Sequence, residues 1–321
     1  MTRGLKLAVS VAALAMGAMA VGAHANAISY FTTIYGTDWT TAGVAMRGTN
    51  GVGTLNVSGI SGTVTKSYLW WHGPTNTTDP TDNAHVMVNA NAVTGTNIGF
   101  SQDNYWNYAN SQAYRADTTS IINANGAYAL TNFTTTNSNI NGAGTAVFFN
   151  DGNAANNRDV VLFDGNDSNF ASAYDAAGWD VHLNGVDYSG GQAFLTMFVS
   201  DGQNFSSDDD GTLEINGTTL ATGGIFQGTS PGVGVANGTL WDIETFDITS
   251  FLTPGMNNLH ITLDAGFSDA LSAVVFAIDL PAGAAPPPPN TGVPEPLSLS
   301  LFGMGLAGLV AYRRRKAAKQ V

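Results

Sequence analysis

The sequence contains no cysteine, and basic residues are scarce over most of its length. Without cysteine the chain forms no disulfide, but a body of roughly 250 residues is long enough to bury a core without one. Between residues 27 and 293 there are 23 acidic side chains and only four basic ones, Arg47, Lys66, Arg115 and Arg158. An electrostatic field of that sign argues against nucleic acid as a partner and offers anionic lipid no basic patch.

The motifs of several enzyme classes are also absent. There is no phosphate-binding P-loop and no HxH or HExxH spacing. Aspartate is plentiful but glutamate is limited to three residues, so no carboxylate pair stands out as that of a glycoside hydrolase. We interpret the scattered histidines as strand residues rather than zinc ligands; they are His72, His85, His182 and His260. These absences predict a non-enzymatic protein. A hydrolase is the least favoured of the three functions that we consider.

The first 25 residues have the pattern of a secretory signal peptide. Arg3 and Lys6 form a positively charged start, residues 7–21 are apolar, and Ala23 and Ala25 give the small-x-small cleavage pattern. We expect a signal helix that directs the chain to the Sec translocon and is cut by signal peptidase after Ala25. The alternative is an uncleaved N-terminal anchor.

The C-terminal end combines a short apolar segment with a block of positive charge. Residues 297–312 carry no charge, and as a helix they would span about 24 Å, which is short against a hydrocarbon core of about 30 Å. A basic cluster follows at once and would stay on the cytoplasmic side; it consists of Arg313, Arg314, Arg315 and Lys316. We therefore predict a short transmembrane helix at 297–312, a cytoplasmic tail at 317–321 and a transient inner-membrane tether.

Just before the apolar segment stands the tripeptide Pro294-Glu295-Pro296. Together with that segment and the basic cluster, it resembles the PEP-CTERM sorting signal of Gram-negative bacteria, which we place at residues 294–316. The resemblance implies processing by an exosortase in organisms that make exopolysaccharide and biofilm matrix; the alternative is an ordinary tail anchor. The proline-rich stretch 281–293 is predicted to be an extended linker.

The body has the composition of a β protein. Short runs rich in β-branched and aromatic residues are separated by Asn, Asp, Gly and Ser clusters; examples are SYLWWHG (67–73), TAVFFND (145–151) and AVVFAIDL (273–280). This pattern predicts an all-β fold, an antiparallel β-sandwich of jelly-roll type. Trp70 and Trp71 would point to opposite faces of one strand, so at least one should lie in the core.

The two halves of the body echo each other. ADTTSIINANGAYAL (116–130) and FDITSFLTPGMNNLHITL (246–263) share an Asp-x-Thr-Ser pattern, a glycine turn and a strand. We predict two tandem sandwiches, at residues 26–155 and 156–280, with one larger sandwich as the alternative. Asp117 and Asp247 are interpreted as strand-corner residues that accept backbone N–H bonds.

The same order of segments resembles the galactose-binding-like jelly rolls, in which a hairpin precedes a DxT corner. It also resembles bacterial surface-protein domains of unknown function, through SYLWWHG, YRADTTS and LFDGNDS in that order. These motifs are structural, and they imply a fold rather than an activity.

Two kinds of binding site remain open. The acidic stretches 164–169 and 206–217 have oxygen donors suited to calcium, with Asp164, Asp167, Asp208 and Asp210 as the candidate ligands. The stretch 103–115 sets aromatic residues among amides, so Tyr105, Trp106 and Tyr108 are candidates for stacking on sugar rings. We therefore expect an exported surface or matrix protein associated with exopolysaccharide, and as the alternative a carbohydrate-binding module.

Overall fold

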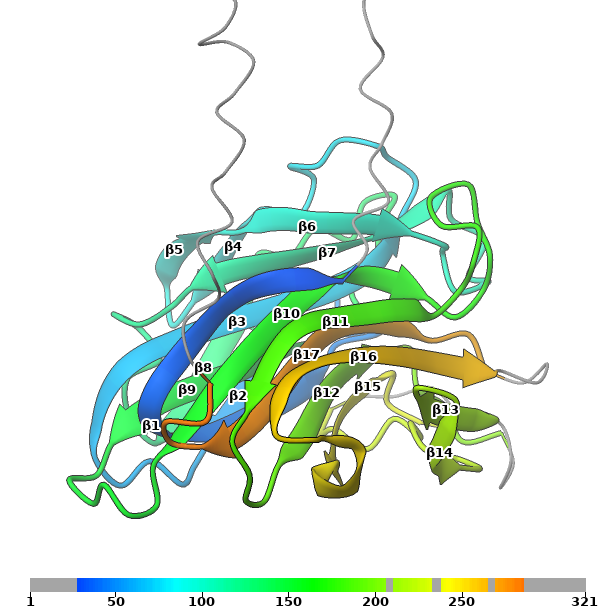
Figure 1. Ribbon diagram of the computed structural model, residues 1–321. Helices are drawn as coiled ribbons and strands as arrows, with labels where there is room; N and C mark the ends of the chain where they lie inside the picture. The colour runs from blue at the N-terminus through cyan, green and yellow to red at the C-terminus, as the bar shows by residue number, and fades with distance from the viewer. Residues whose placement is uncertain (1–27, 206–209, 233–237, 265–268, 286–321) are drawn as a thin grey trace, which may run out of the picture.

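The computed structural model describes residues 28–205, 210–232, 238–264 and 269–285. The predicted signal peptide, the transmembrane helix and the Pro294-Glu295-Pro296 motif lie outside the described residues. Within them, seventeen β-strands and a single 3-10 turn account for the regular structure. All pairings between these strands are antiparallel (Figure 1), which confirms the predicted all-β, antiparallel sandwich class.

The strands fall into a first and a second half of the chain. Those of the first half are β1 (Ser29–Ala45), β2 (Gly53–Val57), β3 (Thr63–Thr75), β4 (His85–Val88), β5 (Asn91–Thr94), β6 (Thr96–Ser101), β7 (Asn110–Asp117), β8 (Gly126–Thr131) and β9 (Gly142–Asn150). Those of the second half are β10 (Arg158–Ser168), β11 (Asp180–Tyr188), β12 (Phe194–Ser200), β13 (Thr212–Ile215), β14 (Thr218–Thr222), β15 (Trp241–Asp247), β16 (Gly255–Asp264) and β17 (Ser272–Pro281); the 3-10 turn is η1 (Thr249–Phe251).

The two halves have the same strand order. In the first half β1-β9-β3-β7 are neighbours in one sheet and β2-β8-β4-β5 form another; in the second half β10-β17-β12-β15 and β11-β16-β13-β14 repeat that arrangement. β1 also pairs with β10, so the two larger sheets form one continuous nine-stranded sheet. Its edge strands are β15 and β6. The chain thus repeats one sandwich topology, while the division into two separate domains stays a prediction.

The described residues form three hydrophobic cores. The first half has its own core, which includes Leu69 and Trp71, and the second half has another, which includes Leu195 and Phe276. A third core lies between the halves, because β6 packs against β10 and β15 packs against β1 and β9. Trp70 is fully buried in this third core, so both neighbouring tryptophans are core residues.

Glycine makes the close approach of the halves sterically feasible. Trp241 of β15 lies against β9, and a Cβ atom at Gly142 would come within 2.7 Å of the Trp241 Cβ. A Cβ at Gly144 would meet the Phe198 ring at 3.0 Å. Side chains at these two positions would therefore push the second half away from β9.

The repeated Asp-x-Thr-Ser segments form the predicted strand corners. Asp117 ends β7 and accepts a hydrogen bond from the backbone N–H of Thr119 at 2.9 Å; Asp247 ends β15 and accepts the equivalent bond from Thr249 at 2.9 Å. Each threonine hydroxyl then accepts a backbone N–H bond of 3.0 Å, from β3 in one half and from the residue before β12 in the other. The interpretation of these aspartates as corner residues is confirmed.

The folded body extends further than expected at its C-terminal end. Pro281 is the last residue of β17, and Ala284 and Ala285 are buried in the core of the second half. The backbone N–H groups of Gly283 and Ala285 also donate to the carboxylate of Asp159. The prediction that a linker begins at residue 281 is therefore wrong, because residues 281–285 are held by the body.

Candidate functional site

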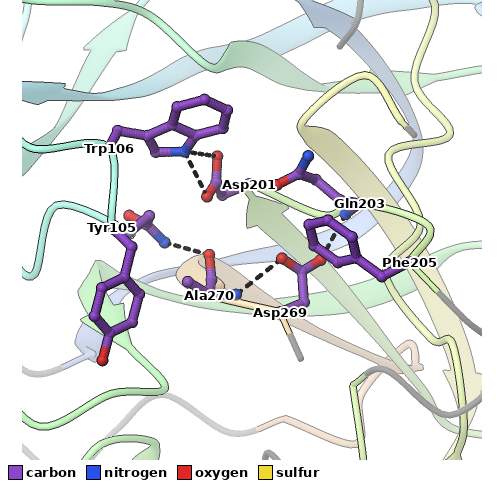
Figure 2. Close-up of a pocket in the computed structure, with 8 residues that line it drawn as sticks. Tyr105, Trp106, Asp201, Gln203, Phe205, Asp269 and Ala270 are labelled. Atoms are coloured by element: carbon purple, nitrogen blue, oxygen red, sulfur yellow. Dashed lines mark hydrogen bonds between the residues drawn. The ribbon is translucent and has the colours of Figure 1, made fainter. Parts of the chain in front are cut away.

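A pocket of about 340 Å³ opens where loops of the two halves meet (Figure 2). The loop between β6 and β7 supplies one wall, and the segments after β12 and before β17 supply the others. The lining residues are Asn104, Tyr105, Trp106, Asp201, Gln203, Phe205, Asp269 and Ala270. The pocket therefore combines aromatic rings with carboxylate and amide groups.

The β6–β7 loop has an unusual backbone. Asn104, Tyr105 and Asn107 all have left-handed φ angles, of 57°, 60° and 63°. Such a conformation is strained for a bulky residue such as tyrosine, and it persists only where neighbouring contacts impose it. Here Asp103 imposes it, because its carboxylate accepts the backbone N–H bonds of Tyr105 at 3.2 Å and of Tyr108 at 2.7 Å.

Asn104 fastens this loop to the second half of the chain. Its side-chain Nδ2 donates to the carbonyl of Ala270 at 2.6 Å, and its Oδ1 accepts a bond from the Ser272 hydroxyl at 3.1 Å. Asn104 is itself buried. The aromatic residues that follow it are therefore presented from a fixed position above the pocket.

Trp106 is held between a cation and a carboxylate. Its indole Nε1 donates to both carboxylate oxygens of Asp201, each at 2.8 Å, as Figure 2 shows. The guanidinium carbon of Arg47 lies 3.7 Å from the centroid of the Trp106 ring and so covers one face of it. Asn141 links the two ions, because it accepts from Arg47 at 2.7 Å and donates to Asp201 at 2.9 Å.

The charges in this network are deeply buried. Burial raises the pKa of Asp201 well above its usual value, while the hydrogen bond from Trp106 and the charge of Arg47 act in the opposite direction. Burial likewise lowers the pKa of Arg47, and the Asp201 carboxylate opposes that shift. Asp201 also has a left-handed φ of 76°. Both of its oxygens are engaged by Trp106, so this carboxylate fixes the pocket wall.

A second buried carboxylate orders the opposite wall. Asp269 accepts the backbone N–H bonds of Gln203 at 2.6 Å and of Ala270 at 2.8 Å. It is only 1% exposed, and it faces the pocket together with the exposed ring of Phe205 (Figure 2). The arrangement can present fixed polar groups and aromatic faces to a ligand.

The three aromatic candidates differ in their freedom to bind a sugar. Tyr105 is 65% exposed, and its ring makes an edge-to-face contact with Phe170, at 5.0 Å between centroids. Trp106 is half-buried beneath Arg47, and Tyr108 is half-buried. Sugar stacking stays a prediction, and Tyr105 has the most accessible ring of the three.

Sequence reasoning missed most of the pocket. Arg47, Asp201 and Asp269 come from segments far apart in the chain, and no spacing links them to Trp106. The only local signal was the Asp201-Gly202 turn directly after a strand rich in apolar residues.

The expected calcium loop at residues 164–169 is wrong. Residues 164–168 lie inside strand β10, and both Asp164 oxygens are engaged by Arg115, at 2.8 and 2.6 Å, while Trp70 donates to one of them at 2.8 Å. Asp167 is buried in the same strand. Asp210 is also buried and accepts the backbone N–H bonds of Ile225 and Phe226, whereas Asp208 lies outside the described residues. Calcium binding at Asp210 stays a prediction.

Among the described residues, no helix is long and apolar enough to cross a membrane. No curated protein is significantly similar in sequence to the chain. Residues 292–316 match the PEP-CTERM protein-sorting motif, which implies an exosortase as the processing partner and a transient membrane anchor. The match covers the C-terminal end alone and says nothing of the body. The chain thus carries, at its C-terminal end, the sorting motif of exported exosortase substrates.

Proposed function

We propose that the chain is a non-enzymatic protein of the cell surface or extracellular matrix. The Sec translocon exports it, signal peptidase removes the first 25 residues, and an exosortase acts at Pro294-Glu295-Pro296. The body is then retained in, or released to, an exopolysaccharide layer. The match of residues 292–316 to the sorting motif carries this proposal, and the acidic body agrees with it because it disfavours nucleic acid as a partner.

The C-terminal end of the mature protein tests the sorting step. A helix of about 24 Å is a poor permanent anchor, while the cluster Arg313 to Lys316 would hold its end in the cytoplasm until a membrane enzyme acts. We expect mature protein from the outer membrane and the medium of the native host to lack everything after about Pro296. C-terminal peptide mass spectrometry measures this, and recovery of intact peptides through Val321 from those fractions would refute the processing step.

Replacing Glu295 with alanine should abolish processing. The residue stands between two prolines, which keep it extended and outside the helix, so its carboxylate is the one distinctive group of the motif. We expect the Glu295→Ala chain to accumulate uncut in the inner membrane. Asn290→Ala, in the segment just upstream, is the matched control and should be processed normally. Normal maturation of Glu295→Ala would contradict the proposed recognition.

Carbohydrate binding at the pocket is the second candidate function. The observation that favours it is the position of Tyr105, whose exposed ring is carried on a left-handed backbone beside buried carboxylates. A ring on a fixed backbone loses less conformational freedom when it stacks on a sugar, and fixed polar groups can orient the hydroxyls.

A glycan array with the full chain tests this second function. We expect binding to at least one acidic or neutral polysaccharide fragment, weakened about two- to tenfold by Tyr105→Ala, because an aromatic contact contributes roughly 0.5–1.5 kcal/mol. Tyr35→Ala is the matched control, since Tyr35 is an exposed tyrosine on β1 outside the pocket. If the chain binds no glycan on the array, or if both variants lose binding equally, carbohydrate binding at the pocket is refuted and only the structural role stands.

A further inference from the structure

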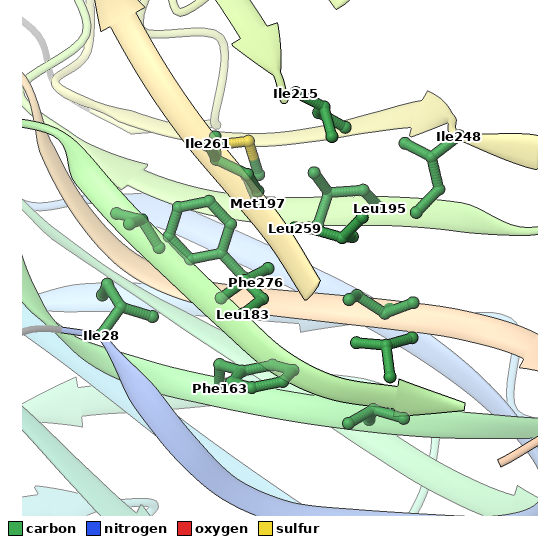
Figure 3. Close-up of a cluster of buried hydrophobic side chains, with 14 of the residues drawn as sticks. Ile28, Phe163, Leu183, Leu195, Met197, Ile215, Ile248, Leu259, Ile261 and Phe276 are labelled. Carbon is green, nitrogen blue, oxygen red and sulfur yellow. The ribbon is translucent and has the colours of Figure 1, made fainter. Parts of the chain in front are cut away.

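Three potential metal ligands meet on the outer face of the second half. Asp180 and His182 lie on β11, and His260 lies on β16. The register pairs His182 directly with His260. Residues that alternate with these three point inward and are buried in the core of the second half; Figure 3 labels Leu183, Leu259 and Ile261 among them. The alternation of β-strands therefore places the three polar side chains together toward solvent.

Their donor atoms converge on one point. The His182 and His260 rings are stacked, with 4.4 Å between centroids and 11° between planes. Nε2 of His260 is hydrogen-bonded to Oδ1 of Asp180, and Nε2 of His182 lies 3.6 Å from the same oxygen. One ligand atom from each residue lies within 4.8 Å of the others. Both rings thus direct the same nitrogen toward one carboxylate.

We propose that Asp180, His182 and His260 bind a divalent transition metal ion of the Zn²⁺ class, with the remaining coordination position open to solvent. Two imidazole nitrogens and one carboxylate oxygen form a ligand set that zinc, copper and nickel accept, whereas calcium and magnesium require oxygen ligands. Three protein ligands and an open position are typical of sites at which the metal exchanges its fourth ligand.

The geometry needs only a small adjustment to hold the ion. Ligand atoms around a tetrahedral Zn²⁺ are roughly 3.3–3.4 Å apart, so the widest separation here, which is within 4.8 Å, must shorten by no more than about 1.4 Å. Side-chain rotation can provide this, because the three side chains are 48%, 56% and 40% exposed. The backbone beneath them is fixed by the strand register and by Asn216, which exchanges two 2.8 Å hydrogen bonds with the backbone of His260.

The spacing of these residues explains why no sequence motif indicates the site. Asp180 and His182 are two positions apart, but His260 follows 78 residues later and joins them only through the β11–β16 pairing. Neither histidine takes part in the pocket or in the sorting motif. The site is therefore independent of the function proposed above.

Titration of the full chain with Zn²⁺, purified without a polyhistidine tag, tests the site. We expect one ion bound per chain by calorimetry, and at 100 times the dissociation constant an increase in melting temperature of about 5 °C. His260→Ala and His182→Ala should each weaken binding at least tenfold. His85→Ala is the matched control, because His85 is an exposed strand histidine that pairs with Thr94 in the first half. Excess Ca²⁺ should leave the affinity of this site for Zn²⁺ unchanged, because calcium requires oxygen ligands.

A second measurement separates ligation from a structural effect of the substitutions. Paramagnetic Cu²⁺ should broaden the ring proton signals of His182 and His260 in the unaltered chain and leave those of His85 sharp. Absence of Zn²⁺ binding by the native chain, unchanged binding by His260→Ala, or equal broadening at His85 would each overturn the proposal.

Discussion

Replacing Arg115 with methionine is expected to destabilise the folded body by about 3–5 kcal/mol, which is the cost of leaving one partner of a buried ion pair without the other. Arg115 lies on β7 in the first half, and it donates to both oxygens of Asp164 on β10 in the second half. Asp164 is only 5% exposed. Methionine removes the guanidinium, which also lies over the Phe31 ring, and leaves the Asp164 carboxylate with Trp70 as its remaining side-chain partner among the described residues.

The exposed ion pair of the same sheet provides the matched control. Lys66 donates to Asp117 at 2.8 Å, and the two side chains are 35% and 51% exposed. Solvent screens this pair, so Lys66→Met should cost less than about 1 kcal/mol. Urea unfolding of both variants at pH 7 measures the difference in the free energy of unfolding. Equal costs for the two substitutions would show that Asp164 finds another partner.

The Arg115→Met deficit should also depend on pH. Burial raises the pKa of Asp164, and the charge of Arg115 opposes that shift, so loss of the arginine raises the pKa further. As the pH falls, the carboxyl group takes up a proton and no longer carries an unpaired charge. We therefore expect the deficit to be largest at neutral pH and to shrink as the pH falls.

Local patterns explain why the fold class followed from the sequence. Strand runs, glycine turns and the Asp117 and Asp247 corners depend on neighbouring residues, which a sequence displays directly. The repeated strand order was visible through the same local echo. The continuous nine-stranded sheet was not, because the β1–β10 pairing joins residues about 130 positions apart and has no local signature.

The pocket and the metal ligands were hidden for a related reason. Trp106 was identified as a candidate, yet its partner Arg47 comes from the segment after β1 and its partner Asp201 from the second half, so only tertiary packing brings the three together. The abundance of aspartate was also misleading. Asp164 was predicted to be a calcium ligand in a loop, but β-sheet pairing buries it beside Arg115. Composition predicts an acidic surface, whereas tertiary structure decides which carboxylates reach it.

Asp167 should make the body less stable as the pH rises. This residue is 2% exposed, and burial first, with a hydrogen bond and charge from Asp175 second, raises its pKa to about 9. The folded chain therefore holds a proton on Asp167 that the unfolded chain releases above about pH 4. Because the folded state binds more protons between about pH 4 and pH 9, the free energy of unfolding falls across that range, by up to about 1.4 kcal/mol per pH unit from this group.

Asp167→Asn should remove this contribution. The amide has the shape of the protonated acid and can still donate a hydrogen bond to Asp175, but it has no proton to lose. The variant should match the native chain near pH 4 and become the more stable of the two as the pH approaches 9. Asp247→Asn gives the opposite sign, because hydrogen bonds from Thr249 lower the pKa of that exposed carboxyl, so its loss should destabilise the chain above about pH 4. Denaturant unfolding at several pH values compares the three proteins, and a parallel pH dependence of Asp167→Asn and the native chain would mean that Asp167 is already ionised in the folded state.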